Sequence, residues 1–256
     1  MVTVDESWLL RAWEAASAVP PAARGAVFAT EAGLTPDLDA ALDLPVAGLT
    51  GLLARLYAEQ FGPTAAAVLD CTACGLSLGV QVPVESVTAD DGGAQVAGEV
   101  SNEVTTPSGR RWSVRVPTTR DLLAAREEPD VVAALLARCV SDPGAHHSPG
   151  TDVQPDPVAL TADAGALDAT LADLAGAAAA TVEVHCPECG ATTSAAVDIA
   201  TFLSASIDRD APSLLAEIAD IAAVFGWSEA EILRLGHARR TAYLALVRGE
   251  RPWPVS

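Results

Sequence analysis

The chain contains no lysine, so all 15 of its basic residues are arginine, while 34 acidic residues set its formal net charge at −19. Without lysine there can be no Gly-x-x-x-x-Gly-Lys loop, which excludes the usual phosphate-binding loop of nucleotide hydrolases. A charge this negative repels the phosphates of nucleic acids and the anionic headgroups of lipids. We therefore expect no nucleic-acid partner.

Long apolar runs and secretion signals are also missing. No stretch approaches the roughly 18 uncharged apolar residues that are needed to cross a bilayer. The first six residues, Met1 to Glu6, lack the basic start of a secretion signal. These absences predict a soluble, cytoplasmic protein with no direct membrane insertion.

Patterns that carry catalysis are absent as well. The sequence has no Gly-x-Gly-x-x-Gly after a strand and no His-Glu-x-x-His. Only four histidines are available, and the acidic residues are spread along helical faces, where solvation explains them. We expect no catalytic residues, and therefore a protein that is not an enzyme.

What the chain does have is a large share of small apolar residues. Half of its 256 residues are hydrophobic, but only 4% are aromatic, which predicts closely packed helices built from small side chains. The length suits one large domain or two small ones. Apolar alternation between residues 66 and 116 indicates strands. The predicted fold is α+β: mostly helical, with a zinc-ribbon-like pair of knuckles and a small antiparallel sheet.

Four of the five cysteines lie in two Cys-x-x-Cys-Gly motifs, each after an apolar, strand-like lead-in. A tetrahedral zinc ion takes four thiolates, and each Cys-x-x-Cys pair supplies two of them from a tight turn. The glycine after each motif permits the positive φ that such a turn needs. We predict a structural Zn²⁺ held by Cys71, Cys74, Cys186 and Cys189.

Three other interpretations of these cysteines compete with the structural site. A catalytic zinc would keep an open position and use histidine, for which His185 is adjacent, but four thiolates already fill the shell. A redox pair would open a helix after a buried strand, and disulfides need an oxidising compartment. The fifth cysteine, Cys139, lies in an apolar run and is expected to be a buried core residue.

The two motifs belong to segments that match at an offset of 115 residues. At this offset Leu52 and Leu56, upstream of the first motif, coincide with Leu167 and Leu171, upstream of the second. Downstream of the motifs, Val82 and Val84 coincide with Val197 and Ile199. We interpret the match as a duplicated unit of helix, strand, knuckle and strand, whose copies meet as a zinc ribbon around a long insertion.

This pattern divides the chain into three predicted segments. Residues 1–48 form an N-terminal helical segment, which begins with a helix over residues 5–18. Residues 49–200 contain the duplicated units with an inserted sheet, helices and loop, and residues 201–256 form a C-terminal helical region. The tryptophans near the start of the chain, Trp8 and Trp13, are either core residues or exposed docking anchors.

Turn and cap residues place the remaining elements. Turns are predicted at Asp90–Gly93 and Thr106–Gly109, and Thr119 is expected to cap the helix that follows. Asp163 is expected on a solvated helix face, together with Asp168 and Asp173. Further helices are predicted over residues 129–140, 160–180, from Pro212 to Gly226, after a Ser228–Glu231 capping box, and over 237–247. His146 and His147, in the loop of residues 141–157, are expected to be solvated.

Three stretches together carry a resemblance to a known family. They are the two knuckles with their flanks, the segment Val116–Leu122, and the block from Phe225 to Leu244. The chain, from about residue 49 to 247, resembles baseplate-associated proteins from gene clusters for contractile phage tails and phage-derived extracellular contractile injection systems. The block Phe225–Leu244 is also similar to the C-terminal part of tail-assembly chaperones. Only the four knuckle cysteines transfer as positions.

The resemblance implies a non-enzymatic structural or assembly protein. The expected partners are other baseplate or tail proteins, and the protein would be assembled into a phage tail-like particle in the cytoplasm. One alternative is a tail-assembly chaperone that is absent from the finished particle. The other is a zinc-dependent hydrolase that uses His185 or the His146–His147 pair.

Overall fold

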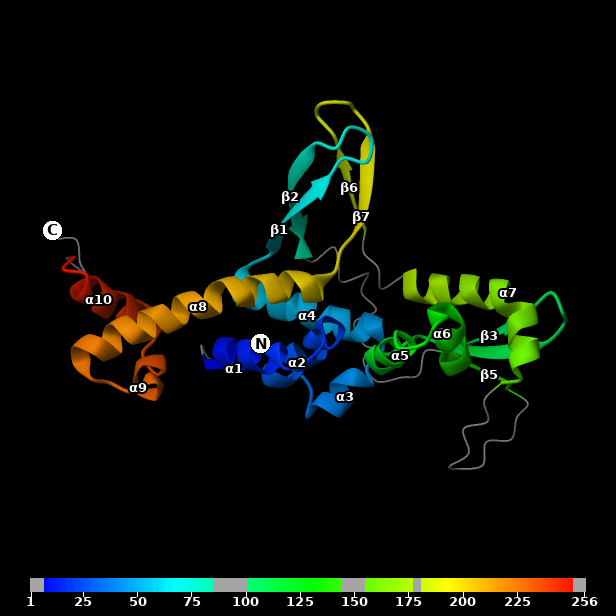
Figure 1. The fold of residues 1–256 in the computed structure, drawn as a ribbon, viewed down its shortest axis with the longest axis horizontal. Helices are drawn as coiled ribbons and strands as arrows, with labels where there is room; N and C mark the ends of the chain where they lie inside the picture. Colours follow the sequence, from blue (N-terminus) through cyan, green and yellow to red (C-terminus); the bar gives the residue numbers. More distant parts are fainter. Residues whose placement is uncertain (1–6, 85–100, 144–154, 177–180, 251–256) are drawn as a thin grey trace.

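The computed structural model describes residues 7–84, 101–143, 155–176 and 181–250. It has an α+β fold, in which a row of helices carries a projecting arm of four strands (Figure 1). A second, smaller group of strands and helices lies at one end of the row, and the C-terminal helices lie at the other. The predicted fold class is confirmed. None of the described helices combines the length and the apolar character needed to span a bilayer.

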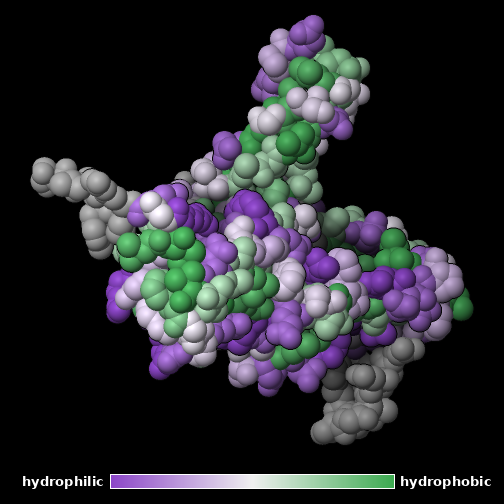
Figure 2. Space-filling view, turned by 60° about the vertical axis from the view of Figure 1, so that its left-hand side comes forward, coloured by the Kyte–Doolittle hydropathy of each residue, from purple (hydrophilic) through white to green (hydrophobic). Residues whose placement is uncertain are grey.

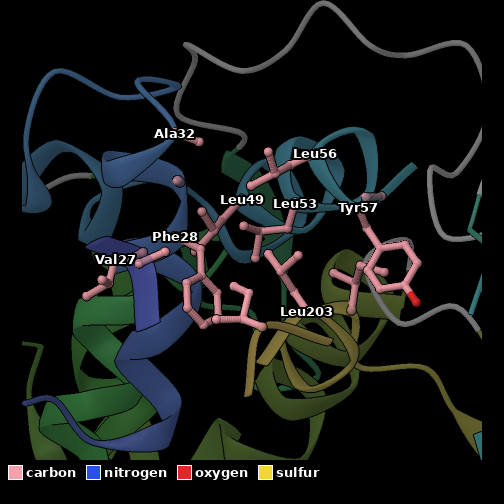
Figure 3. Close-up of a cluster of buried hydrophobic side chains, with 14 of the residues drawn as sticks. Val27, Phe28, Ala32, Leu49, Leu53, Leu56, Tyr57 and Leu203 are labelled. Carbon is pink, nitrogen blue, oxygen red and sulfur yellow. The ribbon is translucent and has the colours of Figure 1, made fainter. Parts of the chain in front are cut away.

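The main core lies among helices from both ends of the chain. Its helices are α1 (Ser7–Ser17), α2 (Arg24–Glu31), α3 (Leu38–Leu42), α4 (Val46–Phe61) and the first part of α8 (Ile199–Phe225). The short helix η1 (Pro21–Ala23) connects α1 to α2. Figure 3 shows Phe28 of α2 and Leu53 of α4 converging with Leu203 of α8. All three side chains are buried, and full burial of such a side chain stabilises the fold by about 2 kcal/mol.

Packing between α2 and the helices beside it depends on a small residue. Gly25 lies so close to Leu53 that an added Cβ would be 2.9 Å from its Cδ1 atom. A larger side chain at this position would therefore force Leu53 or α2 to shift. This contact fits the prediction of closely packed helices built from small side chains.

The main core also contains a tryptophan whose exposure the sequence left open. Trp8 is 1% exposed and packs in the main core, and Trp13 is partly buried against it. The interpretation of Trp8 as an exposed anchor is therefore wrong, because the first turn of α1 faces the other helices. The main core draws residues from all three predicted segments, and the division at residues 48 and 200 stays a prediction.

Two β-hairpins form the arm. The first pairs β1 (Thr64–Asp70) with β2 (Ser77–Pro83), and the second pairs β6 (Thr181–His185) with β7 (Thr192–Ala196), both antiparallel. The hairpins stand side by side, with the knuckle turns at the tip and the strand ends toward α4 and α8 (Figure 1). The predicted order of helix, strand, knuckle and strand is confirmed in both copies, since α4 precedes the first hairpin and α7 (Pro157–Gly176) the second.

Between the hairpins, the chain forms a lobe with its own apolar cluster. The lobe contains a sheet of β3 (Ser101–Thr105), β4 (Arg111–Arg115) and β5 (Val140–Ser141), and it contains helices α5 (Thr119–Ala125), α6 (Val131–Cys139) and α7. Trp112 and Leu167 are at the centre of its core. The predicted turn before β4 is confirmed at Gly109, where φ is 84° and the N–H donates to Thr106.

Asp163 in this lobe is not on a solvated face. It is 5% exposed and accepts hydrogen bonds from Trp112 Nε1 at 2.9 Å and Ser108 Oγ at 3.0 Å. These bonds lower the pKa of Asp163, with the indole N–H as the main cause. The expectation of a solvated Asp163 is therefore wrong, because sequence periodicity could not show that the indole N–H needs an acceptor. Asp168 and Asp173 are exposed as predicted.

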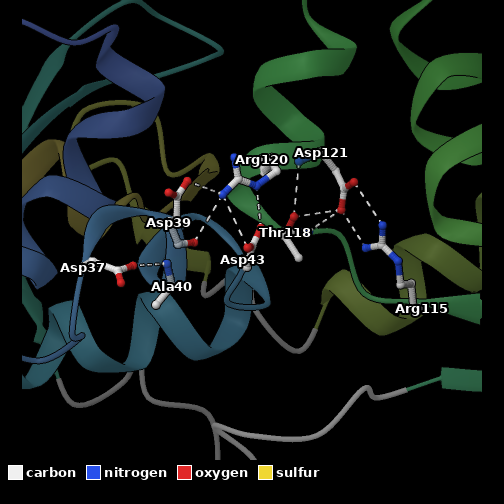
Figure 4. A network of polar contacts seen from close by, with 8 residues as sticks. All are labelled: Asp37, Asp39, Ala40, Asp43, Arg115, Thr118, Arg120 and Asp121. Atoms are coloured by element: carbon white, nitrogen blue, oxygen red, sulfur yellow. Dashed lines mark hydrogen bonds and ion pairs between the residues drawn. The ribbon is translucent and has the colours of Figure 1, made fainter. Parts of the chain in front are cut away.

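Charged side chains connect this lobe to the helical body (Figure 4). Thr118, and not Thr119 as predicted, caps α5, and Asp121 completes a capping box with it. Burial alone would raise the pKa of Asp121, but a two-bonded ion pair with Arg115 and the Thr118 hydrogen bonds hold it below its ordinary value. Arg120 of α5 pairs with Asp39 of α3 and with Asp43, which caps the C-terminal end of α3.

The C-terminal helices form the opposite end of the molecule. Pro212 lies inside the continuous helix α8 and does not begin a new one, which corrects the prediction. Gly226 ends the helix, as predicted, and it adopts a left-handed conformation with φ of 70°. The Ser228 capping box opens α9 (Glu229–Leu233), and α10 (His237–Val247) has the predicted bounds. The predicted Asp90–Gly93 turn lies outside the described residues.

Candidate metal centre

The two knuckles have the same backbone geometry. In the first, the Gly75 N–H donates to the Cys71 carbonyl at 2.8 Å, and the Cys71 N–H donates to Leu76. In the second, Gly190 donates to Cys186 at 2.9 Å, with the equivalent bond from Cys186 to Ala191. Both glycines have positive φ, 75° and 72°, as the sequence predicts. Each turn therefore presents two sulfur atoms from one short loop.

The hairpins bring the four thiols together at the tip of the arm. Their Sγ atoms all lie within 4.8 Å of one another, and together they form a group able to hold a metal ion. The short distances run between the hairpins: 3.6 Å from Cys71 to Cys189 and 3.6 Å from Cys74 to Cys186. The predicted meeting of residues more than 110 positions apart is confirmed.

These distances fit the donor set of a tetrahedral thiolate site. Zinc–sulfur bonds of about 2.3 Å in a tetrahedron place neighbouring sulfur atoms about 3.8 Å apart. A disulfide would need about 2.05 Å, and all five cysteines are free. The arrangement therefore matches metal ligation and does not match any disulfide pairing of the four cysteines.

Burial differs within each pair in the same way. The first cysteine of each motif, Cys71 or Cys186, is buried and packs with Leu78 in a small cluster of its own. The second, Cys74 or Cys189, is exposed at the tip. An ion at this position would therefore have two buried thiol ligands on the inside of the arm and two exposed thiol ligands at its tip.

The pKa values of neighbouring thiols in this group are shifted in opposite directions. Backbone N–H groups of Cys74 and Ala73 lower the pKa of Cys71 to about 6. At Cys74 the N–H of Leu76 acts in the same direction, but burial and the neighbouring thiols raise its pKa to about 12. One thiolate is therefore favoured in the absence of metal, and a second negative charge beside it is costly unless a cation compensates it.

A threonine pair that the sequence did not reveal joins the two hairpins beside the sulfur atoms. Thr193 of β7 is buried, and its Oγ1 accepts a hydrogen bond from the Thr72 N–H at 3.3 Å. The signal for it was present in the duplication, because Thr193 is the equivalent of the buried Leu78 at the offset of 115 residues. A polar residue at a core position indicates a specific partner.

The other candidate residues do not join this centre. His185 is exposed on β6, next to Cys186, and is not in the group of possible ligands. Cys139 is buried in the inserted lobe, as predicted, and burial raises the pKa of its thiol to about 11. His146 and His147 lie outside the described residues.

Comparisons with known proteins identify no relative of this chain. No family model, curated protein or solved structure matches the chain. The case for function therefore depends on the residues themselves and on the resemblance noted in the sequence.

Proposed function

We propose that Cys71, Cys74, Cys186 and Cys189 bind one Zn²⁺ ion that holds the two hairpins of the arm together. The convergence of four sulfur atoms, two from each hairpin, is the single observation that carries this proposal. An all-thiolate set selects a soft or borderline cation and leaves no open position for water, which favours zinc in a structural role.

The arm needs such an ion because its own apolar content is small. Each hairpin is a two-stranded sheet, and such sheets are at best marginally stable alone in water. The apolar cluster between them consists of two cysteines, Leu78 and a few partly buried side chains. Zinc binding to this site would contribute directly to the folding free energy of the arm.

For the whole chain we propose a non-enzymatic structural or assembly component of a contractile phage tail-like particle, formed in the cytoplasm. The resemblance of the knuckles, Val116–Leu122 and Phe225–Leu244 to baseplate-associated proteins motivates this proposal. The projecting arm supports it, since a rigid projection suits contact with other subunits of a particle. The partners would be other baseplate or tail proteins, and not nucleic acid or membrane lipid.

Purification of the particle from cells that make it tests this function. If the chain is a built-in component, it remains with sheath and tube proteins through density-gradient centrifugation at a constant ratio. An assembly chaperone would be present in the lysate and absent from the particle fraction. Deletion of the gene without any effect on particle number or shape would contradict both versions.

The hydrolase alternative has a weaker basis. His185 is near the thiols along the chain, but a fully thiolate-ligated ion has no position at which to activate water. If the alternative were correct, His185→Ala would abolish a zinc-dependent hydrolytic activity without removing the metal. We expect this variant to assemble into particles as the unmodified chain does.

A further inference from the structure

The C-terminal lobe, consisting of α9, α10 and the end of α8, exposes an apolar patch at one end of the molecule. Val224 and Phe225 of α8 and Leu246 of α10 are exposed, with Leu246 at 52%. Figure 2 shows apolar side chains gathered at this end of the molecule. A gathering of exposed apolar side chains of this kind is a candidate contact surface.

Three aromatic rings pack against one another in this patch. The ring of Phe225 stacks on Trp227 at 5.0 Å between centroids, and both meet Tyr243 edge-on, at 5.4 and 4.9 Å. The rings come from α8, the following turn and α10, so they fix these elements to one another. A surface that is ordered in advance loses little conformational entropy when a partner binds.

Helix α10 and its flanks differ from the rest of the protein in charge. Four of the 15 arginines lie between residues 234 and 248, and residues 232–249 contain no acidic residue, in a chain with a net charge of −19. One of the four, Arg240, is buried and pairs with Glu217 of α8 at 3.0 Å. Arg248 lies 3.9 Å from Asp220 of α8. Arg239 is exposed and forms no ion pair with any residue that the structure describes.

Arg239 and the apolar residues share one face of α10. Arg239, Tyr243 and Leu246 are spaced by four and three residues, which places them along the same side of a helix. At about 1.5 Å per residue, Arg239 and Leu246 are about 10 Å apart along the helix axis. A ligand that contacts both must therefore carry a negative group and an apolar face at that separation.

We propose that this face of the C-terminal lobe docks an acidic amphipathic helix of a partner protein. Its apolar side would cover Leu246 and the aromatic rings, while its carboxylates would pair with Arg239. The overall negative charge does not prevent this, because screening limits charge effects to about 8 Å at physiological ionic strength, and the lobe lies at the end of the row of helices. A second copy of the chain is a poorer occupant, since this face packed on its own copy would bring two Arg239 side chains together, and residues 232–249 offer no carboxylate to pair with them.

Binding of model peptides to the full chain tests the proposal. The probes are two labelled 18-residue peptides that form a helix with leucine on one face, one with glutamate on the other face and one with lysine. Fluorescence anisotropy is measured at low and physiological salt. We expect the glutamate peptide to bind, to bind more weakly as salt is added, and to bind more tightly than the lysine peptide.

Matched variants assign the binding to this surface. Arg239→Glu should weaken binding of the glutamate peptide by roughly threefold to fivefold, in keeping with an exposed ion pair. Leu246→Ser should weaken it by about tenfold. Arg55→Glu, at an exposed arginine of α4, and Val132→Ser, at an apolar residue of α6 with the same 52% exposure, should leave it unchanged.

Several results would overturn the proposal. These are failure of the glutamate peptide to bind, equal or tighter binding of the lysine peptide, and equal losses in the control variants. Self-association in sedimentation that is removed by Leu246→Ser would assign the patch to a second copy instead. Thermal melting of each variant separates loss of binding from loss of folding, and because none of the four substitutions touches a cysteine, the result is independent of the metal centre.

Discussion

The two hairpins of the arm have the same turn and different surfaces. Gly75 and Gly190 adopt the same backbone conformation, and each pair of cysteines has one buried and one exposed member. At the offset of 115 residues, however, the exposed Val68 of β1 corresponds to Glu183 of β6, and Ala73 of the first knuckle to Glu188 of the second. The geometry of the thiol turns is thus kept in both copies, while the outward positions of the strands differ freely.

The hairpins are supported in a similar way at their bases. Val82 and Val84, at the end of the first hairpin, are buried in the main core, and so are their equivalents after β7, Val197 and Ile199. Each hairpin is therefore held by the main core at its base and by the thiol centre at the tip of the arm.

Loss of one ligand should have the largest effect, and it should be the same for both hairpins. Cys71→Ser and Cys186→Ser each remove a thiolate from the shared centre, so both should abolish metal binding and most of the hydrogen-exchange protection in β1, β2, β6 and β7. Cys139→Ser is the control, since this buried thiol is not a ligand. Retention of the metal by either ligand variant would show that the two halves are not equivalent.

The knuckle glycines should give a smaller but still equal loss. An added Cβ at Gly75 or Gly190 meets no atom within 4 Å, so the cost of alanine arises only from positive φ and should be about 1 kcal/mol in each hairpin. Gly79→Ala tests the same arm at a position with ordinary φ and open space. Chemical denaturation measures all three, and a loss confined to one hairpin would contradict the shared turn geometry.

Removal of the threonine contact between the hairpins should have a modest effect. Thr193→Val keeps the shape of a buried side chain but removes the acceptor for the Thr72 N–H. We expect the free energy of unfolding to fall by about 1 kcal/mol, as for a single hydrogen bond. Thr192→Val, at the exposed neighbouring position, is the matched control. Equal effects of both variants would show that the hydrogen bond between the hairpins does not contribute to stability.

Exchange of the outward residues should have the smallest effect. Val68 is 75% exposed, so Val68→Glu, which copies the second hairpin, should change the free energy of unfolding by less than about 0.5 kcal/mol. The reverse change, Glu183→Val, should be similarly neutral. A large loss in thermal melting for Val68→Glu would show that this face of the arm supports the fold.

Local chemistry in the sequence was enough to predict much of this arrangement. The Cys-x-x-Cys-Gly spacing predicted both turns, and the repeat at 115 residues predicted that the halves meet. The Ser228–Glu231 pattern and Gly226 predicted the boundaries of the C-terminal helices because caps depend on residues within one turn.

The errors occur where distant residues decide the outcome. Asp163 has the spacing of a solvated residue, but Trp112, which lies 51 positions earlier, supplies its hydrogen bond. Pro212 is a favourable first residue of a helix, yet packing on both sides of it carries α8 through without a break. The threonine contact between the hairpins depends on how two copies of a repeat face each other, which periodicity does not contain.

Metal content is the most direct test of the account. Protein purified without a metal-binding tag, and without added metal, is analysed by elemental mass spectrometry together with a thiol titration before and after chelation. The account predicts one zinc per chain, bound through four thiols that become reactive when the metal is removed. Protein that is folded, free of zinc and fully reactive toward thiol reagents, or that contains two disulfides, would contradict it.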